Sequence, residues 1–543
     1  MTHDKTNNNM VLDDNENKDV PEDYIPGVSR RSFIQAAGTV AAVSAAAAAG
    51  TGCSGKASGG TGWIPHQYEK SGNFPVQVRG RVPIDPHNPS IQRDDQKCIL
   101  CGQCAEVCEK IEHVHNCYEL PLVDSVPCIH CGQCTLWCPT GAITEKDDTA
   151  RLWAALNDPN LHVVCQTAPS TRVGLGEEFG LPAGTNVEGQ QVSALKALGF
   201  DTVLDTNFAA DMTIMEEAME LVLRITGKTS ATEHPLPQFT SCCPAWVKFC
   251  EMYYPDLIPH LSTARSPMGM LGPVIKTYYA QQKTIDPKKI ISVSIMPCTA
   301  KKFEMSRPEM NNAGVFAGDT SVRDTDLVIT TRELARMIKS KGLDLMKLEP
   351  QPYDKMLSEY TGAGAIFGAT GGVMEAAVRS AYRYITKKDE PLLLDLKPVR
   401  GLTTGFWKEA EVDVPGARKV KVAVISGMEN AVHILEKVRK KEGNWDFIEF
   451  MACPGGCIAG GGQPKTSMPP SDDTRKARIS TIYSIDDKSK IRICNDNPEI
   501  VHIYKDFFDE GKPDGGPCGH KAHELLHTHH YEDRSKNFVP KKV

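Results

Sequence analysis

The sequence lacks the motifs with which enzymes bind nicotinamide or flavin cofactors. It contains no glycine-rich dinucleotide fingerprint and no flavin motif, although the pyrophosphate of such cofactors normally rests on a glycine-rich turn at a helix N-terminus. It also has no cysteine modules beyond those described below. We therefore expect that this chain alone neither reduces NAD nor bifurcates electrons.

An excess of positive charge and long apolar segments are absent as well. The 543 residues carry a formal net charge of −7, which argues against a nucleic-acid partner and leaves room for several domains. The longest apolar stretch is rich in alanine and ends at Ala49. It is too short and too weakly apolar for a stop-transfer helix, and we find no other segment that would span a membrane.

A twin-arginine pattern precedes the alanine-rich stretch. Ser29-Arg30-Arg31-Ser32 opens the pattern, and residues 47–49 offer an ordinary cleavage site. We interpret residues 1–60 as a signal and linker read by the twin-arginine export machinery, which carries folded proteins to the periplasm. A lipoprotein anchored through Cys53 is the alternative, but Gly50 stands where a lipobox has leucine.

Eight cysteines form two copies of the spacing C-x2-C-x2-C-x3-C. The two runs are Cys98, Cys101, Cys104 and Cys108, then Cys128, Cys131, Cys134 and Cys138. In two-cluster bacterial ferredoxins the fourth cysteine of each run ligates the cluster of the other run. We therefore predict two 4Fe–4S clusters, with Cys108 and Cys138 exchanged between the runs. A zinc module would use four ligands in two pairs, and two complete runs of four fit clusters better.

Three further cysteine segments each follow a run that predicts a β-strand, at residues 237–240, 290–295 and 447–450. The segments read T-S-C-C-P at 240–244, M-P-C-T-A-K at 296–301 and M-A-C-P-G-G-C at 451–457. Strand ends that converge would offer four thiolates to one iron–sulfur cluster and leave a fifth cysteine beside it. Such a chain would move electrons between ferredoxin-type clusters and chemistry at a buried cysteine site.

These three segments resemble the signatures of the iron-only (FeFe) hydrogenases, and residues 93–543 are similar to that family throughout. The resemblance implies an H-cluster whose 4Fe–4S part is held by Cys243, Cys298, Cys453 and Cys457. It also implies that Cys457 bridges to a two-iron subsite carrying CO, cyanide and an azadithiolate with a bridgehead amine. The implied reaction is the reversible oxidation of H2 to protons and electrons.

Other residues match positions around the two-iron subsite in relatives. Lys301 is implied to donate to a cyanide, although a surface lysine paired with Glu304 is the alternative. Met268 departs from the family, in which glutamine is common beside the subsite. Each member of the implied pocket wall is also compatible with plain core packing. The wall consists of Ala168, Pro169, Ser170, Ser266, Pro267, Met296, Phe367 and Met451.

A proton route is implied by the same resemblance. Cys242 is adjacent to a cluster ligand, and its thiol would relay protons between the bridgehead amine and the protein. The implied route continues through Glu217, Ser262 and Glu220.

The helix that carries the two glutamates is predicted from the sequence itself. The pattern Thr213-Ile214-Met215-Glu216 is typical of a capping box and predicts a helix start near Thr213. Glu217 then lies at the edge of the apolar face, where a carboxyl tends to have a raised pKa that suits a relay. A solvated surface cluster of Glu216, Glu217 and Glu220 is the alternative.

The residues from about Ser467 onward resemble the separate small subunit of periplasmic relatives, joined here to the large one. Residues 462–473 are rich in glycine, proline and serine, as a junction of this kind should be. His523 and His527 are four apart on a predicted helix, which invites a metal-site interpretation. We set it aside, because the segment matches a belt that wraps the catalytic domain.

Six cysteines remain outside these assignments, and we expect most of them to be buried free thiols. They are Cys53, Cys117, Cys165, Cys250, Cys494 and Cys518.

Apolar runs alternate with helical stretches such as 429–438, which predicts parallel sheets covered by helices. The runs lie at 161–165, 202–204, 290–295, 327–330 and 420–425. We predict an α/β fold with a ferredoxin-like 2×(4Fe–4S) domain, a catalytic domain and a small-subunit-like wrapping segment. The expected boundaries are 1–60 for the signal, 61–92 for a lead-in, 93–150, 151–465 and 466–543.

The most concrete hypothesis is a periplasmic hydrogenase, assembled by hydrogenase maturases, that takes up H2 and passes electrons to a multihaem cytochrome c. Two alternatives keep cluster cysteines without this catalysis. An iron–sulfur assembly factor is disfavoured by the export signal, Cys242 and Lys301, and an H2 sensor by the absence of signalling modules.

Overall fold

The computed structural model describes residues 81–114, 127–387, 396–403, 405–414, 418–467 and 470–532. The chain divides into two compact units, residues 1–65 and 66–543, and every described residue belongs to the second. The predicted export signal, Cys53 and Cys117 therefore lie outside the described residues.

The two four-cysteine runs surround a small two-fold-like arrangement of short elements. Strand β1 (Ile91–Arg93) pairs antiparallel with β2 (Ile143–Glu145), and helices α4 (Gln103–Lys110) and α5 (Gln133–Trp137) each begin inside a cysteine run. Gly102 and Gly132 precede these helices with φ of 75° and 72°. Only glycine adopts this left-handed conformation without cost, so both runs make the same tight turn.

Two four-stranded sheets form the frame of the remaining described chain. The order is β4-β3-β6-β7 in the first sheet and β5-β10-β9-β8 in the second, and only β8 in these two sheets is antiparallel to its neighbour. The prediction of parallel sheets in an α/β fold is confirmed. The strands are β3 (His162–Thr167), β4 (Thr202–Asp205), β5 (Gln238–Phe239), β6 (Ile290–Met296), β7 (Leu327–Thr330), β8 (Lys408–Val412), β9 (Val420–Ser426) and β10 (Phe447–Met451).

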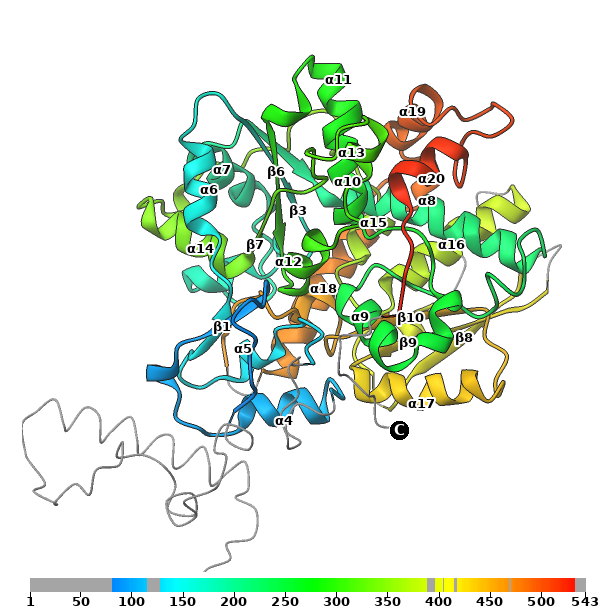
Figure 1. Ribbon diagram of the computed structural model, residues 1–543, viewed down its shortest axis with the longest axis horizontal. Coiled ribbons are helices and arrows are strands. Elements are labelled where there is room, and N and C mark those ends of the chain that lie inside the picture. Colours follow the sequence, from blue (N-terminus) through cyan, green and yellow to red (C-terminus); the bar gives the residue numbers. More distant parts are fainter. Residues whose placement is uncertain are drawn as a thin grey trace, which may run out of the picture. The chain divides into compact units, whose positions relative to one another are not determined.

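Helices cover both faces of each sheet (Figure 1). One face of the first sheet packs against α6 (Thr149–Leu156), α7 (Glu188–Leu198) and α14 (Thr331–Ser340). One face of the second packs against α9 (Pro244–Tyr253) and α17 (Met428–Arg439). The largest apolar core touches both sheets and contains α8 (Thr206–Ile225), α10 (Pro267–Val274), α15 (Gly362–Ile366) and α16 (Gly372–Thr386). Shorter helices are α11 (Ala280–Lys283), α12 (Ala300–Ser306) and α13 (Asn312–Phe316).

Helix α8 begins earlier than the sequence pattern predicts. It starts at Thr206, directly after β4, and the carboxylate of Asp205 caps it by accepting the backbone N–H of Asn207. The predicted start at Thr213 was wrong because Thr213 lies inside the helix, where its hydroxyl donates to the carbonyl of Arg265. The side chains of Thr213 and Glu216, which suggested a capping box, form hydrogen bonds with distant parts of the chain and do not cap a helix end.

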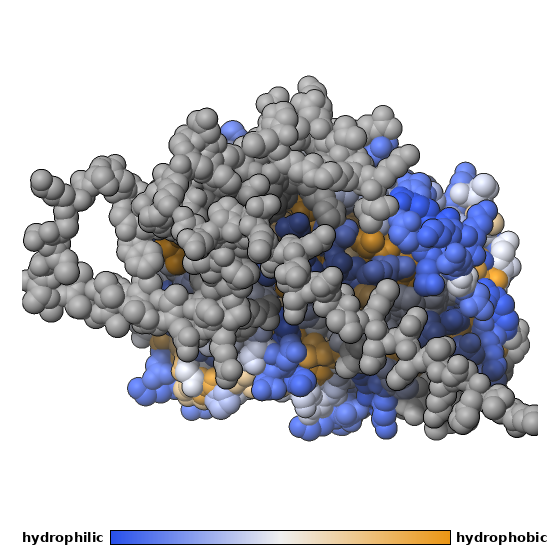
Figure 2. Space-filling view, turned by 90° about the horizontal axis from the view of Figure 1, so that it is seen from below, coloured by the Kyte–Doolittle hydropathy of each residue, from blue (hydrophilic) through white to orange (hydrophobic). Residues whose placement is uncertain are grey.

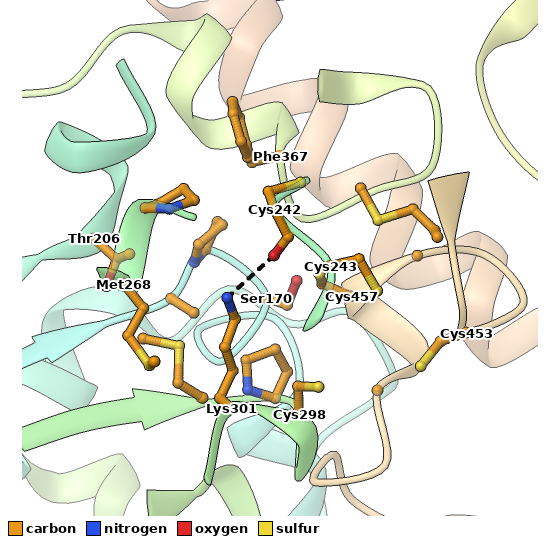
Figure 3. A pocket seen from close by; sticks show the side chains of 18 of the residues that line it. Ser170, Thr206, Cys242, Cys243, Met268, Cys298, Lys301, Phe367, Cys453 and Cys457 are labelled. Carbon is orange, nitrogen blue, oxygen red and sulfur yellow. Dashed lines mark hydrogen bonds between the residues drawn. The ribbon is translucent and has the colours of Figure 1, made fainter. Parts of the chain in front are cut away.

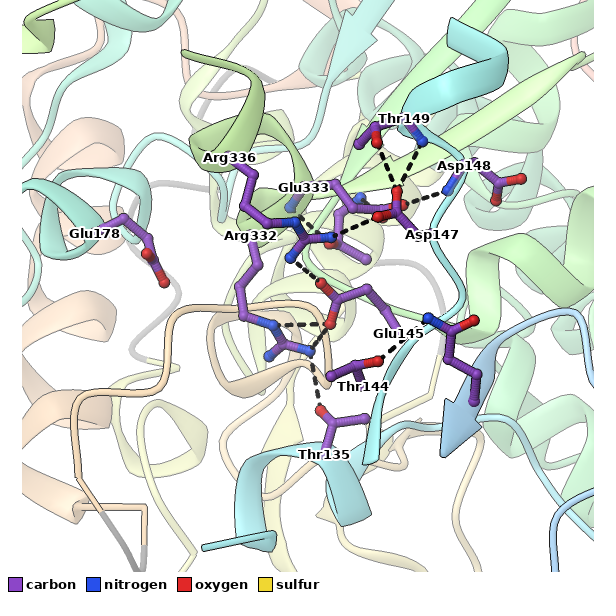
Figure 4. A network of polar contacts seen from close by, with 12 residues as sticks. Thr135, Thr144, Glu145, Asp147, Asp148, Thr149, Glu178, Arg332, Glu333 and Arg336 are labelled. Atoms are coloured by element: carbon purple, nitrogen blue, oxygen red, sulfur yellow. Dashed lines mark hydrogen bonds and ion pairs between the residues drawn. The ribbon is translucent and has the colours of Figure 1, made fainter. Parts of the chain in front are cut away.

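A polar network around the buried carboxylate of Glu145 joins the ferredoxin-type part to the first sheet (Figure 4). Arg332 of α14 donates to Glu145 of β2 at 3.0 Å, to the Thr135 hydroxyl at 3.0 Å and to the carbonyl of Gly461 at 2.7 Å. Arg336 donates to the same carboxylate at 2.6 Å. Burial alone would raise the pKa of Glu145, but the two arginines lower it to about 2. The two parts are thus held together by a carboxylate that stays ionised.

The C-terminal residues pack onto the interior helices instead of building a core of their own. They form α18 (Asp472–Lys488), α19 (Pro498–Asp506) and α20 (His520–Leu526), drawn in orange to red in Figure 1. Ile482, Ile500 and Leu525 belong to the core shared with α8 and α16. Buried Arg478 also makes two 2.7 Å hydrogen bonds to Glu177, so the segment is fixed by both apolar and charged contacts.

The visible described surface in Figure 2 is mainly hydrophilic, with smaller apolar patches in between. Within the described parts of the chain, no helix combines the length and the apolar character needed to cross a membrane. Of the cysteines outside the cluster motifs, Cys165, Cys250 and Cys494 are buried thiols and Cys518 is half-buried. The prediction of buried free thiols is confirmed for the first three.

Candidate active site

The three cysteine segments meet where strands of both sheets end. Cys242 and Cys243 follow β5, Cys298 follows β6, and Cys453 and Cys457 follow β10. All five cysteines line one cavity (Figure 3). Because parallel strands deliver their carboxyl ends to the same edge of a sheet, residues more than two hundred positions apart are brought together.

Four of these thiols fit the ligand set of one iron–sulfur cluster. Burial raises the pKa of Cys298 to about 12 and that of Cys453 well above its ordinary value, and the charges of neighbouring cysteines raise both further. Such thiols become thiolates only when a cationic group such as a metal cluster is bound among them. The sulfur of Cys243 accepts the backbone N–H of Ala452 at 3.5 Å, a contact typical of cluster ligands.

Glycines allow the loops around these thiols to pack closely. A Cβ on Gly456, whose φ is 88°, would lie 2.6 Å from the backbone nitrogen of Thr370. A Cβ on Gly460 would lie 2.2 Å from the carbonyl oxygen of Pro297. A side chain at position 460 would therefore force apart two cysteine-bearing loops, and one at position 456 would push its loop away from the connection between α15 and α16.

The wall of the cavity is almost entirely apolar. Of the predicted wall residues, the structure places seven around the cavity: Ala168, Pro169, Ser170, Pro267, Met296, Phe367 and Met451. Met268, the departure from the family pattern, lines it as well. Ser266 does not, because its hydroxyl caps α10 by accepting the N–H of Gly269 and donates to Glu304 at 2.6 Å.

Sequence reasoning missed two wall residues on α8. Thr206 and Ala210 line the cavity from the first turns of this helix, and the Thr206 hydroxyl donates to Gln166 at 3.0 Å. They were missed because the helix was predicted to start near Thr213, after both of these residues. The signal that points to them is Asp205, an N-cap residue that directly follows an apolar strand.

Lys301 is a buried cation at the edge of the cavity. Its Nζ donates to the carbonyl of Cys242 at 3.1 Å (Figure 3) and to Glu304 at 2.7 Å. Burial opposes the charge, but Glu304 outweighs it and raises the pKa of Lys301. The alternative interpretation is right about the pairing with Glu304 but wrong about the surface position, since Lys301 is only 8% exposed.

Three of the predicted proton-route residues lie on or against α8. The hydroxyl of Ser262 donates to Glu220 at 2.6 Å, and Arg224 pairs with the other oxygen of this carboxylate. Burial alone would raise the pKa of Glu220, but Arg224 and the Ser262 hydroxyl lower it overall. Glu220 is therefore held ionised at neutral pH.

Glu217 has the opposite environment. Burial, together with the charges of Glu220 and Glu449, raises its pKa well above the ordinary value. Among the described residues its carboxyl makes no regular hydrogen bond, although a weaker contact with the N–H of Ser241 is present. Its charge also adds to the burial that raises the pKa of Cys242, so the thiol and this carboxyl are electrostatically coupled.

The alternative of a solvated glutamate cluster is wrong. Glu216, Glu217 and Glu220 are 0%, 1% and 6% exposed. The sequence could not show this, because the residues that cover Glu216 come from the C-terminal segment, 288 to 311 positions away.

The second ferredoxin-type run approaches the same cavity. Burial raises the pKa of Cys131, and the charges of Glu112 and Cys453 add to this effect. The Thr299 hydroxyl, next to Cys298 in the chain, donates to the carbonyl of His130 at 2.7 Å. This one hydrogen bond therefore connects the residue next to Cys298 in the cavity with the residue next to Cys131 in the second ferredoxin-type run.

The eight ferredoxin-type cysteines influence one another across the two runs, and the charges of Cys128, Cys104, Cys108 and Cys138 all act on Cys134. After burial, the charges of Cys101, Cys138 and Cys98 act on Cys104, whereas that of Cys108 acts on Cys128. Backbone N–H groups point at several of these sulfurs, as from Val82 to Cys104 at 3.3 Å and from His130 to Cys128 at 3.4 Å. The arrangement suits two clusters held by hydrogen-bonded thiolates.

Two family models match most of the described chain. Residues 161–461 match the C-terminal domain of the iron-only hydrogenase large subunit. Residues 472–534 match the iron hydrogenase small subunit.

Individual relatives agree with these matches. The chain is 43% identical over 461 residues to iron hydrogenase 1 of Clostridium pasteurianum, covering 82% of this chain and 76% of the relative. It is 44% identical over 402 residues to the periplasmic [Fe] hydrogenase large subunit of Nitratidesulfovibrio vulgaris, covering 71% and 91%. The similarity to the cytosolic Fe–S cluster assembly factor narfl of Danio rerio is lower, 28% over 370 residues, covering 68% and 86%.

Solved structures show the same similarity. The fold matches a variant of [FeFe]-hydrogenase HydA1 from Chlamydomonas reinhardtii with a TM-score of 0.60 and 37% identity, covering 71% of this chain and 98% of that one.

Proposed function

We propose that this chain, which belongs to the iron-only (FeFe) hydrogenase family and is an oxidoreductase acting on H2, oxidises H2 reversibly at the cysteine-lined cavity. The observation that carries the proposal is the set of four cluster-type thiols with a fifth, Cys242, in one apolar cavity. The catalytic and small-subunit sequences are present in a single chain, and we retain the predicted domain boundaries as part of the proposal.

The residues present fit an H-cluster. Cys243, Cys298, Cys453 and Cys457 would hold its 4Fe–4S part, with Cys457 also reaching the two-iron subsite. When bound, the cluster would supply an electrophilic iron and a basic amine between which H2 is cleaved. The protein contributes an apolar wall that excludes water and strengthens local electrostatics, and Lys301 contributes a fixed positive charge.

Protons leave, in this proposal, from Cys242 through Glu217 and Ser262 to Glu220. The raised pKa of Glu217 keeps a proton available on the inner carboxyl, while the lowered pKa of Glu220 keeps the outer one ready to accept. The 2.6 Å contact between Ser262 and Glu220 supports the outer step. Pairs of titratable groups whose environments push their pKa values apart are typical of acid and base assignments.

Electrons would pass through two 4Fe–4S clusters with crossed fourth ligands. One cluster would use Cys98, Cys101, Cys104 and Cys138, and the other Cys128, Cys131, Cys134 and Cys108. The electrostatic contact of Cys131 with Cys453 supports an order in which the second cluster exchanges electrons with the cavity. We further propose a periplasmic location after twin-arginine export, assembly by hydrogenase maturases, and a multihaem cytochrome c as the electron partner.

The test is H2-dependent reduction by the purified, matured protein. We expect rapid reduction of a multihaem cytochrome c under H2 and none of NAD. A preparation with full iron content that reduces neither the cytochrome nor an artificial viologen dye would contradict the proposal. Replacing both Arg30 and Arg31 by lysine should leave this activity intact but retain the protein in the cytoplasmic fraction.

A further inference from the structure

Three potential metal ligands converge where the C-terminal segment covers α8. They are the carboxylate of Glu216, the thiol of Cys518 and the imidazole of His527, and their donor atoms all lie within 4.8 Å of one another. Glu216 and His527 are buried and Cys518 is half-buried. None of the three belongs to the cluster cavity or to the proposed proton route.

The orientation of the group is fixed by neighbouring hydrogen bonds. His527 Nε2 lies 3.0 Å from a carboxylate oxygen of Glu216, while its Nδ1 contacts the Thr263 hydroxyl at 2.8 Å. The hydroxyl of Tyr504 binds the other oxygen of Glu216. A metal-bound histidine typically has its second ring nitrogen held in this way, which fixes the ring and the tautomer.

Cys518 contacts Glu216 through both its backbone N–H and its side-chain sulfur. Its N–H donates to the Glu216 carboxylate at 2.6 Å, and its sulfur lies 3.5 Å from the Glu216 carbonyl oxygen. The φ of Cys518 is 57°, a conformation that is uncommon outside glycine. The turn before α20 thus presents this thiol to the carboxylate and the imidazole.

We propose that Glu216, Cys518 and His527 bind one zinc ion. A mixed oxygen, sulfur and nitrogen donor set favours Zn²⁺ over Mg²⁺ or Ca²⁺, which prefer oxygen alone. Three protein ligands leave the fourth tetrahedral position to water. On binding through Nε2, His527 carries its one ring proton on Nδ1, which donates to the Thr263 hydroxyl, and the ion displaces the thiol proton of Cys518, which passes to solvent.

The zinc ion would crosslink the large-subunit part and the small-subunit part of this chain, which relatives carry on separate subunits. Glu216 lies in the part matched by the large-subunit family, and Cys518 and His527 lie in the part matched by the small subunit. This inference does not depend on the proposed reaction. It also revises the metal interpretation suggested by sequence, since His523 only stacks on His527, with ring centroids 4.8 Å apart.

Metal content tests the proposal directly. The matured full-length protein, produced with zinc in the medium, should contain about one zinc per chain in addition to its iron. Cys518→Ser and His527→Gln should each lose most of that zinc. The matched controls Cys494→Ser, a buried thiol in the same segment, and His523→Gln should retain it.

X-ray absorption at the zinc edge identifies the zinc ligands in the wild-type protein, so this test does not depend on whether the variants fold. We expect one sulfur at about 2.3 Å and nitrogen or oxygen at about 2.0 Å. A shell of four sulfurs would place the zinc in an empty cluster site and overturn the proposal. So would wild-type protein that holds no zinc and acquires none on incubation with Zn²⁺.

Discussion

At the scale of single residues, two carboxyls on one helix illustrate how position determines chemistry. Glu217 and Glu220 are three positions apart on α8. Burial raises the pKa of the first, while Arg224 and Ser262 overcome the same burial and lower the pKa of the second. At neutral pH one holds a proton and the other accepts one, which is the arrangement a relay requires.

Cys242→Ser should preserve the cluster and remove most turnover. Cys242 is not among the four proposed ligands, and a hydroxyl gives up a proton far less readily than a thiol. H2 oxidation should fall at least about 100-fold, within the range of about 10²–10⁴ known for general acid–base groups, with unchanged iron content. Near-normal H2 oxidation in this variant would exclude a thiol relay.

Glu217→Gln should slow turnover without destabilising the fold. The folded-state pKa of Glu217 lies above its unfolded value, so ionisation of the unfolded chain costs stability as pH rises between the two values. Glutamine does not ionise, so the variant should unfold at the same or a higher temperature at pH 8. A fall in both stability and rate would assign Glu217 a structural role instead.

Arg224→Gln should shift the pH dependence of turnover. Without the guanidinium, burial dominates and the pKa of Glu220 rises, so the acid limb of the rate profile should move to higher pH. Lys228→Gln removes the same charge from an exposed position just beyond α8 and serves as the control. Identical profiles for Arg224→Gln and wild type would show that Glu220 does not limit proton transfer.

At the scale of elements, buried parallel strands were predictable and helix ends were not. A strand such as β6 is covered on both faces, so it reads as a nearly continuous apolar run. The edge strand β8, with the sequence K-E-A-E-V, is half exposed and gave no such signal. The start of α8 was misplaced because Thr213 and Glu216 form tertiary contacts that imitate a local cap.

We expect Arg332 to contribute most of the polar stabilisation between the ferredoxin-type part and α14. It reaches Glu145, Thr135 and Gly461 at once, and removing one partner of a buried pair costs about 3–5 kcal/mol. Arg332→Ala should therefore lower the free energy of unfolding of this region by that order, measured by denaturant titration.

Arg336→Ala is the matched control for this experiment. Arg336 contacts the same carboxylate, but its side chain is 47% exposed, and exposed pairs contribute about 0–1 kcal/mol. Equal losses in the two variants would contradict the assignment of the support to Arg332.

At the scale of the whole molecule, the cysteines and most of the cavity wall were predictable from the sequence, but the polar contacts around them were not. Spacing indicated the eight ferredoxin-type ligands, and strand context indicated that the other three cysteine segments converge. The resemblance to the family then implied which four of those five cysteines are ligands and that Cys242 is not one. The sequence could not indicate that Glu304 accepts hydrogen bonds from both Ser266 and Lys301. Nor could it indicate that residues 518–527 enclose Glu216. Such contacts depend on packing between segments distant in sequence.

The central claim is that the cavity binds an H-cluster and turns over H2. Infrared spectra of the protein, made with its maturation machinery and recorded under H2 and then CO, test it most directly. We predict sharp CO and cyanide stretches that shift between the two gases. Absence of these bands from a protein with full 4Fe–4S occupancy, prepared beside a relative that shows them, would contradict the account.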